Sequence, residues 1–250
     1  MEIYVWFVFF LLGLVFGSFF NVVGLRVPIG MSFVSGRSHC PTCYHRLHWL
    51  DLIPVLSFCL QKGTCRYCRA PVSVIYPAME LLTGVLFAYG YVKIGLTVEL
   101  ATALLLVSML VIITVSDIAY MVIPNHILLF FLPLLFIFRL ISPLDPWYDA
   151  FLGAVVGFVI IAFIILISKG GMGAGDMKLF FVLGIVLGWK NILLTLFIAA
   201  LLGSIFGILL RFLQKVEARQ PIPFGPFIAA AALLTYFHGD ALLDAYLAFF

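Results

Sequence analysis

The sequence predicts an all-α polytopic membrane protein, and its composition, its low charge content and the length of its apolar runs lead to this prediction. Of the 250 residues, 65% are hydrophobic and 10% are charged, and the mean hydropathy is +1.24. Soluble domains average about 45–50% apolar and about 25% charged residues. A run of about 20 apolar residues crosses the roughly 30 Å hydrocarbon layer as one helix. We therefore expect about eight transmembrane helices in a lipid bilayer, with a small, zinc-ribbon-like cytoplasmic insertion.

The apolar runs divide the chain into three predicted segments. Residues 1–25 form the first transmembrane helix, because neither a basic start nor a small-residue cleavage site marks a cleaved signal peptide. Residues 26–71 are polar and contain four paired cysteines, and residues 72–250 hold the other spans. The sixth span is short and the eighth is interrupted by His238-Gly239-Asp240, so either could be re-entrant or broken. The expected spans lie near 4–25, 72–91, 96–115, 122–141, 148–168, 179–187, 191–213 and from about 226 onward.

The basic residues predict the orientation of the chain, because Lys and Arg are retained on the cytoplasmic side of a membrane. With the N-terminus outside, eleven of the fourteen fall in cytoplasmic segments, and Lys93, Arg139 and Lys190 fall outside. We therefore expect a multi-pass protein of the cytoplasmic membrane, whose polar segment faces a reducing compartment that disfavours structural disulfides. We expect no nucleic-acid partner.

A glycine cluster that ends in one carboxylate, residues 170–178, is the first candidate site. Its four glycines let the backbone bend, and Asp176 follows them directly before an apolar run. An acid so close to a membrane span marks a functional site by default. The alternative is a flexible connector whose aspartate only caps the next helix.

Asp117 is the second candidate acid, at the cytoplasmic end of the third predicted span. The predicted topology gives Asp117 and Asp176 the same membrane depth on different helices. Two close carboxylates cannot both ionise, so one stays protonated as a general acid while the other activates water. This is the minimal machinery of aspartyl peptide hydrolysis. The alternatives are two independent interfacial acids, or a transporter or channel that uses both acids for ions or protons.

Gly173-Ala174-Gly175-Asp176 resembles the GxGD signature of membrane aspartyl proteases, and the whole chain resembles the type 4 prepilin peptidase family. Within that family it is most similar to the competence-pilus prepilin leader peptidases of Gram-positive bacteria. The resemblance is carried, in order, by Gly17-Ser18-Phe19 with Asn21-Val22, two CxxC pairs, Leu52-Ile53-Pro54 with Ser57, Tyr76-Pro77 with Glu80, Asp117 with Pro124, and Gly175-Asp176-Met177-Lys178-Leu179.

The resemblance implies an enzyme that cleaves the basic leader from type IV prepilins or pseudopilins, with Asp117 and Asp176 as catalytic residues. Gly173, Gly175 and Lys178 fall in its motif and are expected to support the substrate or the structure. The family also implies N-methylation of the new N-terminus with S-adenosylmethionine, so residues 26–71 are expected to be methyltransferase-associated and residues 72–250 to form the peptidase domain. Ala119 and Asn125 stand where many relatives have further acids, which leaves Asp117 as the only carboxylate of its loop.

The four paired cysteines predict a metal site. Cys40 and Cys43 form one CxxC pair, and Cys65 and Cys68 form the other after a spacer of 21 residues. Two such pairs can close a tetrahedral four-thiolate zinc site, which would add folding energy to a segment without a large core. Redox cycling and a metal-free thiol cluster are the alternatives. The fifth cysteine, Cys59, lies in an apolar stretch and is expected to be buried.

Glu80 lies well inside the second predicted span. A carboxylate there needs a partner or a polar cavity. It could line the active site, contact the substrate amine or form a structural ion pair with an arginine of residues 26–71, and the ion pair is the simplest expectation.

Overall fold

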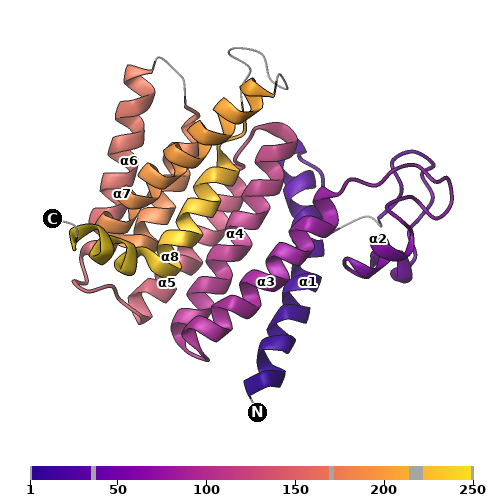
Figure 1. Ribbon diagram of the computed structural model, residues 1–250, viewed down its shortest axis with the longest axis horizontal. Helices are drawn as coiled ribbons and strands as arrows, with labels where there is room; N and C mark the ends of the chain where they lie inside the picture. Colours follow the sequence, from indigo (N-terminus) through magenta and orange to yellow (C-terminus); the bar gives the residue numbers. More distant parts are fainter. Residues whose placement is uncertain (1, 35–37, 169–171, 214–221, 249–250) are drawn as a thin grey trace. The chain divides into compact units, whose positions relative to one another are not determined.

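The structure is a computed structural model that describes residues 2–34, 38–168, 172–213 and 222–248. Within these ranges the regular elements are α-helices and 3-10 helices, apart from two isolated β-bridges in the cysteine-containing segment (Figure 1). The all-α prediction is confirmed. The chain divides into two compact units, residues 1–115 and 116–250, which are described separately.

The first unit combines membrane helices with the cysteine-containing segment. Helix α4 (Val98–Tyr120) begins in the first unit, and the last residues of this helix, from Ser116 onward, belong to the second unit. The other elements of the first unit are α1 (Glu2–Arg26), η1 (Val27–Ile29), η2 (Trp49–Leu52), α2 (Leu56–Leu60) and α3 (Ile75–Ile94).

Helices α1 and α3 pack closely because α1 presents glycines to α3. A Cβ atom at Gly13 would lie 2.6 Å from the Gly84 Cα atom, and one at Gly17 would lie 2.8 Å from the Glu80 Cα atom. Small residues of this kind let membrane helices approach where lipid gives no hydrophobic driving force. The contact fixes the position of Glu80 against α1.

Four further helices make up the second unit with the end of α4. Helix α7 is 39 residues long and contains one residue with non-helical backbone angles, Gly188, at φ 77° and ψ 174°. The helices are α5 (Asn125–Ile141), α6 (Asp149–Ile167), α7 (Ala174–Phe212) and α8 (Gly225–Leu247).

Helix α7 folds back on itself at Gly188 (Figure 1). A Cβ atom at Gly157 of α6 would lie 2.6 Å from the Phe180 carbonyl oxygen and 3.1 Å from Ile192 Cγ1. In a straight helix residues 180 and 192 would be about 18 Å apart. One position on α6 therefore contacts both limbs of α7, residues 174–187 and 189–212.

Two charged side chains bind the backbone groups that the reversal leaves without helical partners. The buried Arg139 donates from Nε to the carbonyl oxygen of Val186 at 3.0 Å, before Gly188. Asp149 accepts from the backbone N–H of Trp189 at 3.5 Å, after Gly188. Because hydrocarbon offers no water to unpaired backbone groups, these contacts make the reversal compatible with a membrane.

The helices confirm the predicted spans, with one correction. In the described ranges six helices are long and apolar enough to cross a membrane, and α5, with 17 residues, is a shorter apolar helix. The predicted sixth and seventh spans correspond to the two limbs of α7, which is one of these six helices. The predicted interruption of the eighth span is wrong, because α8 continues through His238-Gly239-Asp240.

The close contact of α6 with α7 predicts that Gly184 tolerates no side chain. A Cβ atom there would overlap the carbonyl group of Gly153. Gly184→Ala is expected to destabilise the protein by about 2 kcal/mol, the usual cost of overpacking. Gly207→Ala, in the same helix, is the matched control, because its nearest neighbour would be Ile222 Cδ1 at 3.7 Å. Thermal unfolding in detergent should show a lower Tm for the first variant only; equal Tm values would contradict this packing.

Candidate active site

Asp117 lies in the last turn of α4, in the second unit, and is only 6% exposed. Its Oδ2 atom accepts a hydrogen bond from the backbone N–H of Gly225 at 2.7 Å. Gly225 begins α8, where backbone N–H groups have no partner within the helix. The first turn of α8 therefore orients the Asp117 carboxylate.

The chain leaves α4 through a fixed turn directly after Asp117. Met121 has a left-handed φ of 54°, and its N–H donates to the carbonyl oxygen of Asp117 at 2.8 Å. Ser116 donates from Oγ to the carbonyl oxygen of Val122 at 2.6 Å. This turn brings Ile123 against Gly175, where a Cβ atom would lie 3.0 Å from Ile123 Cβ. A side chain at the second glycine of the GxGD segment would therefore displace this turn.

Asp176 lies in the first turn of α7 and is 9% exposed. Its Oδ2 atom accepts from the backbone N–H of Gly173, the residue before the helix, at 3.0 Å. The aspartate therefore caps its own helix, as the alternative interpretation of this segment expected. Capping does not exclude a second role, because the turn that follows Asp117 packs through Ile123 against Gly175, the residue before Asp176. Gly170 and Gly171, also part of the predicted cluster, lie outside the described residues.

The two acids thus share one design. Each is a buried carboxylate that accepts one backbone N–H from the start of a helix, α8 for Asp117 and α7 for Asp176. The positive end of a helix dipole favours negative charge at this position. A pair of interacting, buried carboxylates on separate helices can hold one proton between them and activate a water molecule.

Lys178 lies on the side of α7 away from Asp176, because two residues in an α-helix are about 200° apart. Its Nζ atom donates to Oδ1 of Asn125 at 2.9 Å, which connects α7 with α5. Both residues border an open apolar pocket of about 550 Å³ that residues of α5, α6 and α7 line. Lys178 therefore contacts α5 and does not face the acids.

Sequence reasoning assigned no role to Gly225. Its contribution to the site is a backbone donor, which leaves no side-chain signature. The available signal was Gly225-Pro226, since proline is favoured at the start of a helix and cannot continue one. A Cβ atom at Gly225 would lie 2.8 Å from Asp117 Oδ2, so the carboxylate and the helix start fit only without a side chain.

The four paired cysteines of the first unit form one cluster. Their sulfur atoms lie within 4.8 Å of one another, and the Sγ atoms of Cys40 and Cys68 are 3.8 Å apart. Four sulfurs around a tetrahedral metal at about 2.3 Å would be about 3.8 Å apart. The cluster could therefore hold a metal ion with little rearrangement.

The two cysteine pairs have the same backbone geometry. In the first, the N–H of Tyr44 donates to the Cys40 carbonyl and Tyr44 has φ 55°; in the second, Arg69 donates to Cys65 and has φ 58°. The N–H groups of Cys43 and Thr42 lower the pKa of the Cys40 thiol to about 6. Burial and contacts with the other three cysteines raise the pKa of the Cys68 thiol to about 11. Without a metal, the cluster therefore favours the thiolate, the form that binds metals, at Cys40 and the protonated thiol at Cys68.

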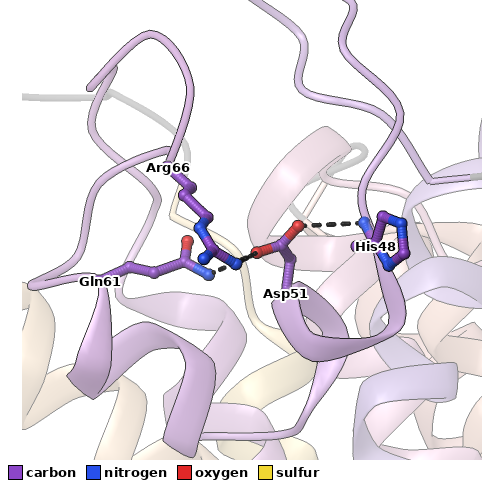
Figure 2. A network of polar contacts seen from close by, with 4 residues as sticks. All are labelled: His48, Asp51, Gln61 and Arg66. Carbon is purple, nitrogen blue, oxygen red and sulfur yellow. Dashed lines mark hydrogen bonds and ion pairs between the residues drawn. The ribbon is translucent and has the colours of Figure 1, made fainter.

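Asp51 connects the second cysteine pair with the segment between the pairs (Figure 2). Its nearly inaccessible carboxylate accepts from the N–H of His48 at 3.0 Å and from Gln61 Nε2 at 2.9 Å, and lies 3.9 Å from Arg66 Nη1. Since the Arg66 side chain is 59% exposed, the two hydrogen bonds contribute more than the ion pair. Cys59 is exposed on α2, which corrects the prediction that it is buried; α2 has five residues, none of them buried.

Comparison with known proteins identifies the family. Residues 11–94 match the family described as the bacterial peptidase A24 N-terminal domain, and residues 104–208 match the type IV leader peptidase family. A prepilin leader peptidase/N-methyltransferase of Bacillus subtilis (strain 168) is 45% identical over 238 residues, covering 95% of this chain and 96% of the relative. The chain belongs to the type IV leader peptidase family.

Other members of the type IV leader peptidase family are similar over most of their length. The prepilin leader peptidase/N-methyltransferase of Aeromonas salmonicida (strain A449) is 37% identical, covering 95% of this chain and 92% of the relative. The prepilin leader peptidase/N-methyltransferase of Myxococcus xanthus (strain DK1622) is 41% identical, covering 86% of this chain and 68% of the relative. No solved structure matches the chain. The leader peptidase match contains both acids, and the N-terminal match contains the four cysteines and Glu80.

The cysteine cluster predicts a bound metal ion, about one per chain. Cys40→Ser is expected to lower both metal content and thermal stability, because binding free energy at such a site is folding free energy. Cys59→Ser, which changes the exposed cysteine outside the cluster, should change neither. Elemental analysis and Tm measurements on the purified variants check this. Metal-free, fully stable protein with four free thiols would contradict it.

Proposed function

We propose that the chain is a prepilin leader peptidase that also N-methylates its product, as the names of its relatives describe. The observation that carries the proposal is the pair of buried acids, Asp117 and Asp176, each oriented by a backbone N–H at the start of a helix. The substrates are type IV prepilins or pseudopilins, whose basic leader is removed.

In the proposed hydrolysis, Asp117 and Asp176 share one proton and hold a water molecule between them. The carboxylate takes a proton from this water as its oxygen attacks the scissile carbonyl, and the protonated acid stabilises the oxyanion that develops. The C–N bond then breaks, and a proton passes to the released amine. Gly225 and Gly173 keep the two carboxylates in place, so little reorganisation accompanies the reaction.

The position of the acids favours hydrolysis over transport. Asp117 is in the last turn of α4 and Asp176 in the first turn of α7, so both lie at helix ends that come together in the second unit. A transporter would need polar groups along a path across the membrane, whereas a peptidase needs the acids together where the peptide enters.

We propose that this end of the second unit faces the cytoplasm and that the N-terminus lies outside. The excess of basic residues on one side supports this orientation. Of the eleven that define it, Arg37, Lys169, Lys215 and Arg219 lie outside the described residues. A cytoplasmic site would meet the basic leader of a substrate whose apolar segment remains in the bilayer.

Zinc is the metal we propose for the cysteine cluster. Four thiolates in a tetrahedral arrangement suit zinc, and the sulfur spacing of 3.8 Å between Cys40 and Cys68 fits its bond lengths. A closed site with four protein ligands serves structure and leaves no open position for a reacting group. Zinc would therefore stabilise residues 26–71 without taking part in hydrolysis.

S-adenosylmethionine is the proposed methyl donor, and it supplies an activated methyl group to an amine. The proposed division of labour places methyl transfer in residues 26–71 and the adjacent span ends, and hydrolysis in residues 72–250, after a first helix at 1–25. The N-terminal family match, which lies outside the leader peptidase match, supports a separate location for the second activity.

Intact-mass analysis tests both activities in one experiment. Purified protein is incubated with a prepilin, with and without S-adenosylmethionine. The product is expected to lose its leader in both cases, and to gain about 14 Da, one methyl group, only with the donor. An uncleaved substrate would contradict the peptidase; a cleaved product that never gains this mass would contradict the methyltransferase alone.

The dyad is expected to act as a unit. Asn keeps the shape of Asp but cannot exchange the proton, so Asp117→Asn and Asp176→Asn should each lower cleavage by about 1,000-fold or more. The double variant should be little worse than either single one. Asp244→Asn, at an exposed position of α8, is the matched control. Initial cleavage rates of folded, membrane-inserted variants give the answer, and substantial cleavage by Asp176→Asn would exclude this mechanism.

Gly225→Ala should impair cleavage without weakening substrate binding. The added Cβ would lie 2.8 Å from Asp117 Oδ2 and displace the carboxylate. Because a misplacement of about 1 Å can cost about 100-fold in rate, kcat should fall by this order while KM stays constant. Gly207→Ala serves as the control. If steady-state kinetics showed a raised KM and an unchanged kcat, Gly225 would serve substrate binding and not the orientation of Asp117.

A further inference from the structure

Glu80 is a buried carboxylate that no positive charge among the described residues compensates. It lies in α3 within the first unit and is 8% exposed. The expected ion pair with an arginine is absent: in the described part of the chain no charged side chain acts on Glu80. An acid inside a membrane segment without such a partner is a candidate for binding a cationic ligand.

The face of α1 opposite Glu80 offers a further acceptor, the side-chain oxygen of Asn21. Ser18 hydrogen-bonds the Glu80 carboxylate, and Asn21, three residues later on the same face, donates from Nδ2 to the Tyr76 carbonyl oxygen at 3.1 Å. Asn21 is 2% exposed, and its buried Oδ1 atom has no hydrogen-bond partner among the residues that the structure describes. Tyr76 lies one helical turn before Glu80 on α3, so Asn21 contacts α3 one turn from the residue that carries the carboxylate.

The backbone around this carboxylate is held in an unusual conformation. Val55, just before α2, has a left-handed φ of 62°, which is rare for a β-branched residue. Its N–H donates to Glu80 Oε2 at 2.7 Å. Strained backbone of this kind is concentrated at functional sites, where the surrounding structure maintains it. The charged hydrogen bond to Glu80 connects residues 26–71 to the membrane helices.

We propose that Glu80 accepts the N-terminal ammonium group released by leader cleavage and takes its proton before methyl transfer. The inference rests on the proposed methyltransferase function and names its base. The Glu80 carboxylate and the buried Asn21 Oδ1 atom can both accept hydrogen bonds. An ammonium group matches them, because it has a positive charge and three N–H donors. The N-terminal family match contains both residues.

The chemistry requires a base at this point, because an ammonium group has no lone pair. Glu80 takes one proton, and the neutral amine nitrogen forms a bond to the methyl carbon of the sulfonium donor. The S–CH₃ bond breaks, and its electron pair stays on a neutral thioether. The proton on Glu80 then passes to water. The positive charge thus moves from sulfur to the methylated amine.

In the described ranges, the groups that face Glu80 leave it as the one titrating residue of the site. From α1 these are Ser18 and Gly17, and from the segment before α2 the backbone N–H of Val55. None of them changes charge near neutral pH. The pH dependence of methyl transfer therefore reports on the amine and on Glu80.

Glu80→Gln tests the inference, because Gln still accepts the Val55 hydrogen bond but cannot take a proton. A free N-terminal amine has a pKa of about 7.7–8.0, so without a base about 2% is neutral at pH 6 and about 80% at pH 8.5. The variant should therefore methylate more slowly than wild type at pH 6, by up to about 50-fold, and less than about twofold more slowly at pH 8.5. Leader cleavage should continue, and calorimetric binding of S-adenosylmethionine should match wild type.

Two further variants complete the experiment. Glu99→Gln, another glutamate of the first unit, is the matched control and should methylate as wild type does. Asn21→Leu removes the unpaired Oδ1 and leaves the carboxylate; it should slow methylation by about 10-fold with cleavage retained. If Glu80→Gln does not accumulate, this second variant decides the question.

The possible outcomes are distinct. A pH-dependent deficit in Glu80→Gln, with donor binding intact, supports the inference. A deficit of equal size at both pH values, or methylation at the wild-type rate, overturns it and leaves the proposed function standing. Wild-type protein that cleaves but never methylates overturns both the second activity and this inference.

Discussion

A backbone N–H at the start of a helix orients each of the two acids, and the proposed chemistry depends on these two hydrogen bonds. The first-turn donors of a helix have no partner within it, and in a membrane they need one. Gly225 gives its donor to Asp117, and Gly173 gives its donor to Asp176. Helix α8 must therefore begin where α4 ends. The same requirement explains the glycine at position 225, since a Cβ atom there would lie 2.8 Å from the Asp117 carboxylate. At Gly173 a Cβ atom would meet Asp176 Oδ2 at 3.3 Å, so the constraint on that residue is weaker.

The reversal of α7 depends on the same rule of satisfied backbone groups. Gly153 and Gly157 of α6 let both limbs of α7 come within van der Waals contact, and Gly188 adopts angles that suit only glycine. Arg139 and Asp149 then bind the backbone groups on either side of the turn. Charged residues that the sequence places at the edge of the membrane thus serve the fold in this unit, whereas no basic side chain of the described residues pairs with Asp117 or Asp176.

Apolar run lengths predicted the membrane helices, because in hydrocarbon the number of consecutive apolar residues fixes where a helix can lie. The cysteine spacing predicted the thiol cluster for a similar reason, since ligand geometry constrains sequence directly. What could not be predicted are contacts made by the backbone. Gly225 and Val55 donate their N–H groups to carboxylates, and a backbone donor is common to every residue except proline. Among the described residues the backbone N–H of Val55 binds Glu80 where an arginine was expected. Cys59 was misjudged because a five-residue helix buries no face.

The first limb of α7 has a further consequence. Its residues 174–187 rise about 21 Å, whereas the hydrocarbon layer of a typical bilayer is about 30 Å thick. A span this short creates hydrophobic mismatch, which the bilayer relieves by thinning around the protein. Thinning at the end that carries Asp176 would bring water and headgroups down to the acids and shorten the distance a peptide bond must travel out of the bilayer. The thickness of the surrounding lipid thereby becomes part of the machinery, and membranes of different composition would set different rates for the same protein.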